Sequence, residues 1–76
     1  MNIKHAQYML TVMQEGSITA AAKKLYISQP SLSQMIKLVE TNLGTAIFNR
    51  STAPITLTYA GEKYIEAAKQ ILTINN

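Results

Sequence analysis

Residues 16–34 read GSITAAAKKLYISQPSLSQ, and this stretch decides the fold. Ser17 is a good N-cap for a short helix over about 18–25, and Ser28 is a good N-cap for the helix that follows a tight connection. Pro30 is tolerated in the first turn of that helix, because its missing N–H would have no partner there. Two helices joined by so tight a turn predict a helix-turn-helix, in which the second helix can enter the major groove of DNA while the first braces it.

The chain before this stretch predicts a first helix over about 3–15, because apolar residues recur there at spacings of three and four. Asn2 can cap its start, and Gly16 can end it, since glycine adopts a left-handed conformation at little cost. The third helix is predicted to continue to Gly44. Its buried face is predicted to consist of Leu32, Ile36, Val39 and Leu43.

The remainder of the chain predicts a hairpin and a last helix. Two short runs rich in β-branched and aromatic residues, 47–50 and 55–58, flank a turn-forming cluster. Thr58 can cap a helix that runs from about residue 59 toward 72. The order helix, helix, helix, hairpin, helix predicts a mainly α winged helix-turn-helix, with a three-helix core, a hairpin wing and a further helix at the C-terminal end.

The outer face of the third helix carries small polar and amide side chains that suit base edges. Glutamine side chains can pair with adenine N6 and N7, serine hydroxyls can donate or accept, a proline ring can contact a thymine methyl, and a lysine can reach phosphate or guanine. The candidate contacts there are Gln29, Pro30, Ser31, Ser33, Gln34 and Lys37. The alternative is a polar, solvated face on an ordinary helical bundle, and the order of the elements weighs against it.

Five segments, in register and spread over nearly the whole chain, closely resemble the pattern of LysR-type transcriptional regulators. They are EGSITAAAKKL at 15–25, ISQPSLS at 27–33, LG at 43–44, FNR at 48–50 and LTYAG at 57–61. The resemblance implies the DNA-binding part of a bacterial regulator that reads double-stranded DNA. It also implies a winged helix-turn-helix domain at 1–58 and, at 59–76, a linker helix that pairs with its twin in a homodimer. Full members carry a C-terminal domain that binds a small-molecule effector, and we expect that domain to be missing here.

The resemblance extends the DNA face to the start of the second helix and to the wing. It adds Ser17, Thr19, Arg50 and Thr52 to the candidate contacts. Members often carry Arg where this chain has Gln34, and a basic residue near the wing tip, where this chain has residues 52–54. Fewer phosphate contacts and a shallower salt dependence are therefore expected. Arg50 is expected either on DNA or in an internal ion pair with Glu40.

The last helix carries two apolar stripes that are rotated by about 100° from each other. One stripe consists of Ala60, Tyr64, Ala67 and Ile71, and the other consists of Ile65, Ala68 and Leu72. We expect core packing to use the first stripe, so dimerisation is predicted through Ile65, Ala68 and Leu72. Two copies would place their recognition helices about 34 Å or a multiple apart, on a roughly palindromic site.

The composition excludes several other classes of protein. The 76 residues make one small domain, and 47% hydrophobic with only 14% charged residues argues against disorder. There is no cysteine, and the single histidine, His5, cannot form a zinc site alone, so we expect neither metal nor cofactor. We find no signal peptide and no apolar run near the ~18 residues that span a membrane. A cytoplasmic protein with a net charge of +3 is expected.

Two functions from other classes compete with DNA binding. An enzyme would need a nucleophile–base pair and a deep pocket, and the sequence indicates neither. Glu62 and Glu66 are four residues apart, but they lie on a polar helical surface, so acid–base work is not expected of them. A winged helix that binds protein is the other alternative, and the missing wing-tip arginine and Gln34 are the features that favour it.

Overall fold

Four helices and a two-stranded hairpin make up residues 2–74, which are the residues that the computed structural model describes. In chain order they are α1 (Ile3–Glu15), α2 (Ile18–Leu25), α3 (Gln29–Leu43), β1 (Phe48–Asn49), β2 (Thr56–Leu57) and α4 (Tyr59–Ile74). This order confirms the predicted mainly α winged helix-turn-helix. The last two positions of the predicted linker helix, 75 and 76, lie outside the described residues.

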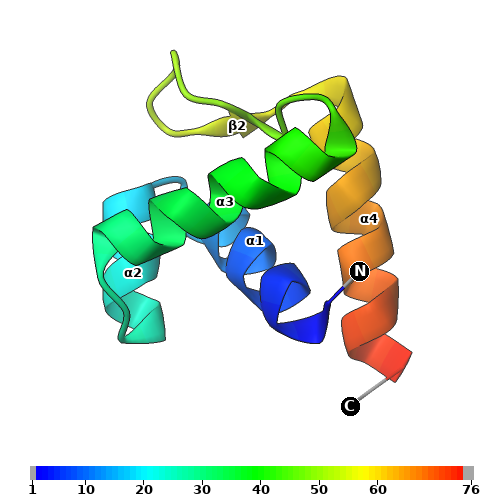
Figure 1. The fold of residues 1–76 in the computed structure, drawn as a ribbon, viewed down its shortest axis with the longest axis horizontal. Helices are drawn as coiled ribbons and strands as arrows, with labels where there is room; N and C mark the ends of the chain where they lie inside the picture. The colour runs from blue at the N-terminus through cyan, green and yellow to red at the C-terminus, as the bar shows by residue number, and fades with distance from the viewer. Residues whose placement is uncertain (1, 75–76) are drawn as a thin grey trace.

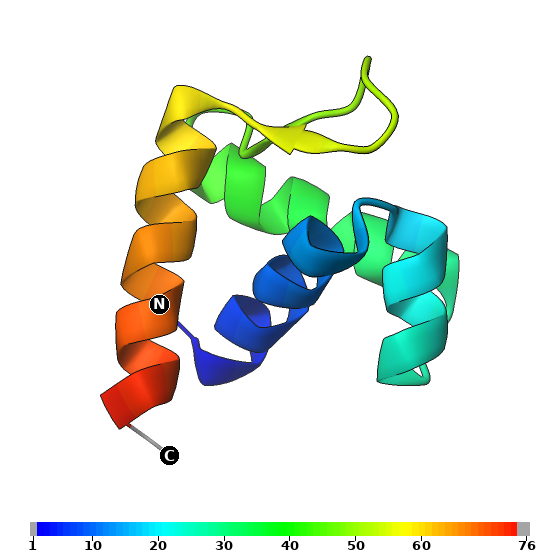
Figure 2. The same cartoon turned by 180° about the vertical axis from the view of Figure 1, so that it is seen from behind.

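The other three helices pack against α1, as both views of the ribbon show (Figures 1 and 2). The short α2 lies on one side of α1 and α4 lies on the other, while α3 crosses between them. The hairpin leaves the junction of α3 and α4, and its tip points away from α4. The beginning of α3 therefore lies beside α2, at the opposite side of the molecule from α4.

Each of these helices begins at a polar side chain that accepts hydrogen bonds from the backbone of its first turn. Asn2 Oδ1 accepts from the N–H groups of Lys4 (2.7 Å) and His5 (3.3 Å). The hydroxyl oxygens of Ser17, Ser28 and Thr58 accept from the N–H groups of Ala20 (3.1 Å), Ser31 (3.2 Å) and Gly61 (2.9 Å). All four predicted N-caps are confirmed, and each satisfies a donor that the helix leaves unpaired.

The connection between α2 and α3 takes only residues 26–28, because Tyr26 adopts a left-handed backbone conformation with a φ of 58°. The Ile27 N–H donates to Ala22 O over 3.1 Å and closes the end of α2. Residues other than glycine rarely adopt this conformation. Tyr26 is 95% exposed, so packing of its side chain contributes little to the stability of the turn. The tight turn brings the first turns of α2 and α3 close together.

Apolar side chains from all four helices and from the start of the wing form the core of the described residues. Its largest fully buried side chains are Met9, Val12, Leu32, Ile36 and Ile47. The small Ala21 and Ala22 are also buried, which lets α2 approach its neighbours closely. Leu43 was predicted to be buried with Leu32 and Ile36, but it is 47% exposed at the end of α3. This end of α3 borders the exposed face of α4 instead of the core.

The inward face of α4 differs from the predicted one. Ile65 and Ala68 are 3% and 0% exposed, and α4 packs along α1. The prediction that these two side chains contact a partner helix is therefore wrong, because they are already buried inside the protomer. Leu72, the third predicted dimer contact, is half-buried. The stripe predicted to be internal, which includes Ala60, Tyr64 and Ala67, is only half-buried and lines an open groove.

Gly61 explains why α4 turns this face inward. The backbone of α4 comes so close to Ile47 that a Cβ at position 61 would lie 2.9 Å from the Ile47 carbonyl carbon and 3.2 Å from its Cα. Thr58 holds this approach, since its N–H donates to Ile47 O over 3.0 Å and its hydroxyl donates to Ala46 O over 2.6 Å. With position 61 facing inward, Ile65 and Ala68 follow on the same helical face.

The wing is a short antiparallel hairpin in which Phe48 pairs with Leu57 and Asn49 pairs with Thr56. Each strand has two residues, fewer than the four predicted for each run. Asn49 organises the turn, because its Oδ1 accepts from the N–H of Ser51 (3.2 Å) and from the Ser51 hydroxyl (2.6 Å). The end of the wing loop, just before β2, is tied to the α1–α2 turn, where the Ile55 N–H donates to Gly16 O over 2.9 Å. The wing is thereby held in position relative to the helix-turn-helix.

Candidate nucleic-acid interface

The first turns of α3 present most of the predicted contact residues to solvent. Leu32 and Ile36 are fully buried and orient the helix, so the opposite face points outward. The exposed members of the predicted set on α3 are Gln29, Pro30, Ser31, Gln34 and Lys37. Ser33 is half-buried on the flank of this face. A helix anchored by its inner face and lined outside with amides and hydroxyls can offer hydrogen bonds to base edges without first rearranging.

Ser31 is oriented by the residue that caps α3. The Ser28 hydroxyl donates to Ser31 Oγ over 2.8 Å, while Ser28 Oγ accepts from the Ser31 N–H over 3.2 Å. Because Ser31 Oγ acts as the acceptor in this pair, its own proton can be donated to an outside acceptor such as a phosphate oxygen. This arrangement follows from the Ser28–Ser31 spacing at the helix start.

Thr19 and Gln29 join the two helices of the helix-turn-helix. The Thr19 hydroxyl, in the first turn of α2, donates to Gln29 Oε1, in the first turn of α3, over 3.1 Å. Both side chains are exposed. The structure therefore brings together two predicted contact residues that are ten positions apart in the chain. Ser17 lies two positions before Thr19 in the chain. It is half-buried, and its hydroxyl oxygen caps α2.

Arg50 forms an ion pair inside the protomer, which was one of the two sequence-based alternatives. Its Nη2 lies 3.6 Å from Glu40 Oε1, and the two side chains are 45% and 17% exposed. Glu40 Oε2 accepts from the backbone N–H groups of Ile47 (2.7 Å) and Phe48 (3.3 Å). Glu40 thus ties the end of α3 to the start of the wing, and Arg50 is directed toward that carboxylate.

Thr52 is exposed at the turn of the wing and bonds within it. Its Oγ1 lies 3.1 Å from Thr56 Oγ1 and donates to Asn49 O over 3.3 Å. Residues 51–54 are exposed as well, and none of them is charged. Arg50 and Thr52 therefore lie on a separate element from the α3 face, and the hairpin brings no free cation toward it.

Lysine side chains supply the positive charge of the helix-turn-helix. Lys23 and Lys37 are exposed, and no ion pair is found for either within residues 2–74. Lys24 is exposed too, but its Nζ lies 3.4 Å from Glu15 Oε2. Two such lysines in the helix-turn-helix are a modest number of phosphate partners, and the shallow salt dependence expected from the sequence stays a prediction.

A second surface is formed by the outward face of α4 and the end of α3. It contains a largely apolar groove of about 510 Å³ lined by Leu43, Thr45, Tyr59, Ala60, Lys63, Tyr64 and Ala67. Tyr59 is 76% exposed, and Lys63 Nζ lies 5.6 Å from the centre of its ring. Ala60, Tyr64 and Ala67 were predicted to lie in the core, so this surface was not expected from the sequence. Gly61 was the signal, since a glycine within a helix marks the face that packs closely.

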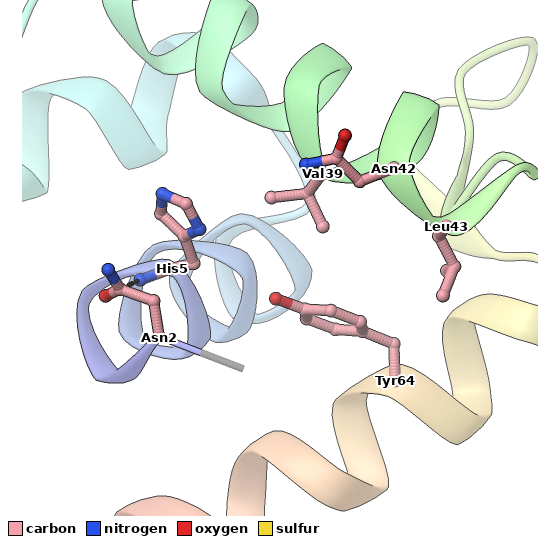
Figure 3. A pocket seen from close by; sticks show the side chains of 6 residues that line it. All are labelled: Asn2, His5, Val39, Asn42, Leu43 and Tyr64. Atoms are coloured by element: carbon pink, nitrogen blue, oxygen red, sulfur yellow. Dashed lines mark hydrogen bonds between the residues drawn. The ribbon is translucent and has the colours of Figure 1, made fainter.

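Tyr64 also borders a neighbouring cavity of about 410 Å³ between the start of α1, the end of α3 and α4 (Figure 3). Asn2, His5, Val39, Asn42 and Leu43 complete its lining. Figure 3 shows the Tyr64 ring extending from α4 with its hydroxyl turned toward α1. Burial raises the pKa of Tyr64 above its usual value of 10.0, because the phenolate would lose hydration there. Within residues 2–74 there is no group of three side chains that could hold a metal ion.

The comparison with known proteins extends over nearly the whole chain. Residues 3–62 match the family described as bacterial regulatory helix-turn-helix protein, lysR family. The chain is 44% identical over 73 residues to the HTH-type transcriptional regulator BsdA of Bacillus subtilis (strain 168), covering 95% of this chain and 25% of BsdA. It is 43% identical over 76 residues to the HTH-type transcriptional regulator BudR of Klebsiella aerogenes, covering 100% of this chain and 53% of BudR. The chain thus spans between a quarter and about half of these relatives.

Two solved structures are similar to this chain over nearly its whole length. The BenM_DBD/benA site 1 DNA complex matches with a TM-score of 0.90 and 36% identity, over 96% of this chain and 82% of that one. The CbnR_DBD–DNA complex matches with a TM-score of 0.89 and 35% identity, over 99% of this chain and 86% of that one. Within residues 2–74, no helix is both long and apolar enough to cross a membrane. The chain belongs to the LysR family of bacterial helix-turn-helix regulatory proteins.

Proposed function

We propose that this chain binds double-stranded DNA as a homodimer and acts as the DNA-reading part of a transcriptional regulator. The first turns of α3 enter the major groove, and α2 braces them across the backbone. The observation that carries the proposal is the exposed row of Gln29, Gln34 and Lys37 on a helix whose opposite face is anchored by Leu32 and Ile36. Similarity to domains solved in complex with DNA supports the same assignment.

Replacing Gln29 and Ser33 together with glutamate should lower the affinity for a selected operator by about 100-fold or more. Each wild-type side chain is expected to contribute a base contact of about 1–3 kcal/mol, and each new carboxylate would lie against a surface that already carries negative phosphates. Fluorescence anisotropy with an operator selected from a random DNA pool measures the loss. The selection itself should return a roughly palindromic site.

Gln7→Glu is the matched control, because Gln7 is exposed on α1 and the substitution makes the same chemical change away from α3. Its affinity should stay within about twofold of the wild type, since a single distant surface charge is largely screened. Equal losses in the control and in the double variant would show that charge alone, and not the α3 face, governs binding. A wild-type chain that selects no sequence would favour the protein-binding alternative.

The homodimer forms, in this proposal, through the apolar groove between Leu43 and α4. A second copy is the occupant that fits, because each copy presents the same exposed helix, and twofold assembly makes such a surface self-complementary. The half-buried Ala60 and Ala67 leave room for a partner helix, while the exposed Tyr59 adds apolar area at the rim. Two recognition helices would then be presented about 34 Å or a multiple apart.

Replacing Ala60 and Ala67 with lysine should convert the dimer to a monomer in sedimentation experiments at micromolar concentration. Both side chains line the groove, so the new ammonium groups would be buried between the two copies without partners. Glu66→Lys, on an exposed position of the same helix, is the control and should remain dimeric. If the double lysine variant still sediments as a dimer, the interface lies elsewhere on the protomer.

A further inference from the structure

We propose that Thr19 is a positioning residue that turns the Gln29 carboxamide so that Gln29 reads guanine and not adenine. The inference rests on the proposed function, because it concerns how the α3 face recognises a base. Its starting point is the hydrogen bond from the Thr19 hydroxyl to Gln29 Oε1, over 3.1 Å. This bond determines which part of the Gln29 amide remains available to DNA.

A glutamine side chain has one oxygen that accepts and one nitrogen that donates twice. In this structure the oxygen is directed at α2, where Thr19 donates to it. The nitrogen lies on the other branch of the amide, and within residues 2–74 it has no hydrogen-bond partner. Gln29 is exposed, so both amide protons can be offered to a ligand that approaches the beginning of α3.

The base edges of the major groove differ in the pattern of donors and acceptors that they offer. Adenine pairs a donor at N6 with an acceptor at N7, so its usual glutamine contact uses the amide oxygen and nitrogen together. Guanine offers two acceptors, O6 and N7, which two N–H groups can serve. A Gln29 whose oxygen is held by Thr19 matches the edge of guanine. This revises the expectation from the sequence that Gln29 pairs with adenine.

The location of the pair favours a maintained geometry on DNA. Thr19 and Gln29 lie in the first turns of α2 and α3, and these two helices pack together over a core cluster that includes Ala22 and Leu32. When DNA covers this surface and displaces water, a hydrogen bond between the two side chains becomes stronger electrostatically. The Thr19 hydroxyl therefore limits rotation of the amide at the moment when the base is read.

The test measures base preference in place of overall affinity. The wild-type chain selects its operator from a random DNA pool, and the Gln29→Ala chain then identifies the base position that loses its preference. At that position the wild type should prefer guanine to adenine by at least about fivefold, the lower end expected for a good two-bond contact. Replacing that guanine with 7-deazaguanine, which lacks the N7 acceptor, should weaken wild-type binding and leave Gln29→Ala binding unchanged.

Thr19→Val keeps the shape of the side chain and removes its hydroxyl, so the amide can turn over and accept from adenine. The ratio of guanine to adenine affinity should then fall below about twofold, whereas Thr19→Ser should retain the wild-type ratio. Thr11→Val, the same exchange on α1, is the matched control. A wild-type preference for adenine, or an unchanged ratio in Thr19→Val, overturns this inference while DNA binding stands. A wild-type chain that selects no sequence overturns the proposed function and this inference with it.

Discussion

Replacing Gly61 with alanine should destabilise the domain by about 3 kcal/mol or more, although alanine is the better helix former by about 1 kcal/mol. The new Cβ would be forced into the backbone of Ile47, lying 2.9 Å from its carbonyl carbon and 3.2 Å from its Cα. Neither segment can yield easily. Ile47 is fully buried, and its carbonyl oxygen already accepts from the Thr58 N–H over 3.0 Å. The N-terminal end of α4 would have to leave the core.

Thermal or urea unfolding followed by circular dichroism measures this loss. A domain of this size unfolds with a free energy of about 4–11 kcal/mol, so the expected change is a large part of the total. It corresponds to a fall in Tm of at least about 10 °C. Helix propensity predicts that this substitution raises the free energy of unfolding, and close packing predicts that it lowers it. The direction of the shift in Tm alone therefore separates the two effects.

Gly44→Ala is the matched control for the Gly61 experiment. Gly44 ends α3 with a φ of 82°, but a Cβ there would meet nothing within 4 Å. Its substitution therefore incurs only the cost of a left-handed conformation, about 1 kcal/mol. If Gly61→Ala proved as mild as Gly44→Ala, the close approach of α4 to Ile47 would be contradicted.

Replacing Glu40 with alanine should lower the free energy of unfolding by about 2–4 kcal/mol and loosen the wing. Glu40 Oε2 accepts from the backbone N–H groups of Ile47 and Phe48, at 2.7 and 3.3 Å. Both of those residues are buried, at 0% and 3% exposure, so their N–H groups would lose a partner where water has little access. Leaving a buried donor unpaired costs about 1–3 kcal/mol. Urea unfolding and hydrogen exchange of these two amides measure the effect.

Arg50→Ala separates the two roles of Glu40. The ion pair between Arg50 and Glu40 has a separation of 3.6 Å and a half-exposed arginine, so its removal should cost less than about 1 kcal/mol. Glu40→Gln keeps an acceptor oxygen, so its loss of unfolding free energy should lie between those of Arg50→Ala and Glu40→Ala. Equal losses for Arg50→Ala and Glu40→Ala would mean that the ion pair, and not the two backbone hydrogen bonds, fastens the wing.

The boundaries of the first three helices could be read from the sequence because they are set within a few residues. Asn2, Ser17 and Ser28 each accept from a backbone N–H two or three positions ahead. Gly16 ends α1 with a φ of 67°, a conformation that favours glycine. Such interactions involve neighbours in the chain, so they need no knowledge of the rest of the fold. The order of the elements and the exposed face of α3 followed from them.

The orientation of α4 could not be settled in this way. Its two apolar stripes have similar composition, and periodicity alone does not say which one is buried. Gly61 lies on the stripe with Ile65 and Ala68, and its contact with Ile47 turns that stripe inward. The prediction did not use the missing side chain of Gly61, so the stripe that is buried was assigned to the dimer.

The sequence alone determined the helices, the tight α2–α3 turn and the family, because these depend on local caps, glycines and a motif in one register. Only the tertiary structure decided which face of α4 is free, that Arg50 points to Glu40, and that Thr19 holds Gln29. The two side-chain pairs join groups ten residues apart, and the Gly61–Ile47 contact joins backbones fourteen positions apart. Hydrogen bonds and steric contacts act only over a few ångströms. These three contacts therefore form only when the packing of the helices brings groups that lie far apart in the chain within reach of each other.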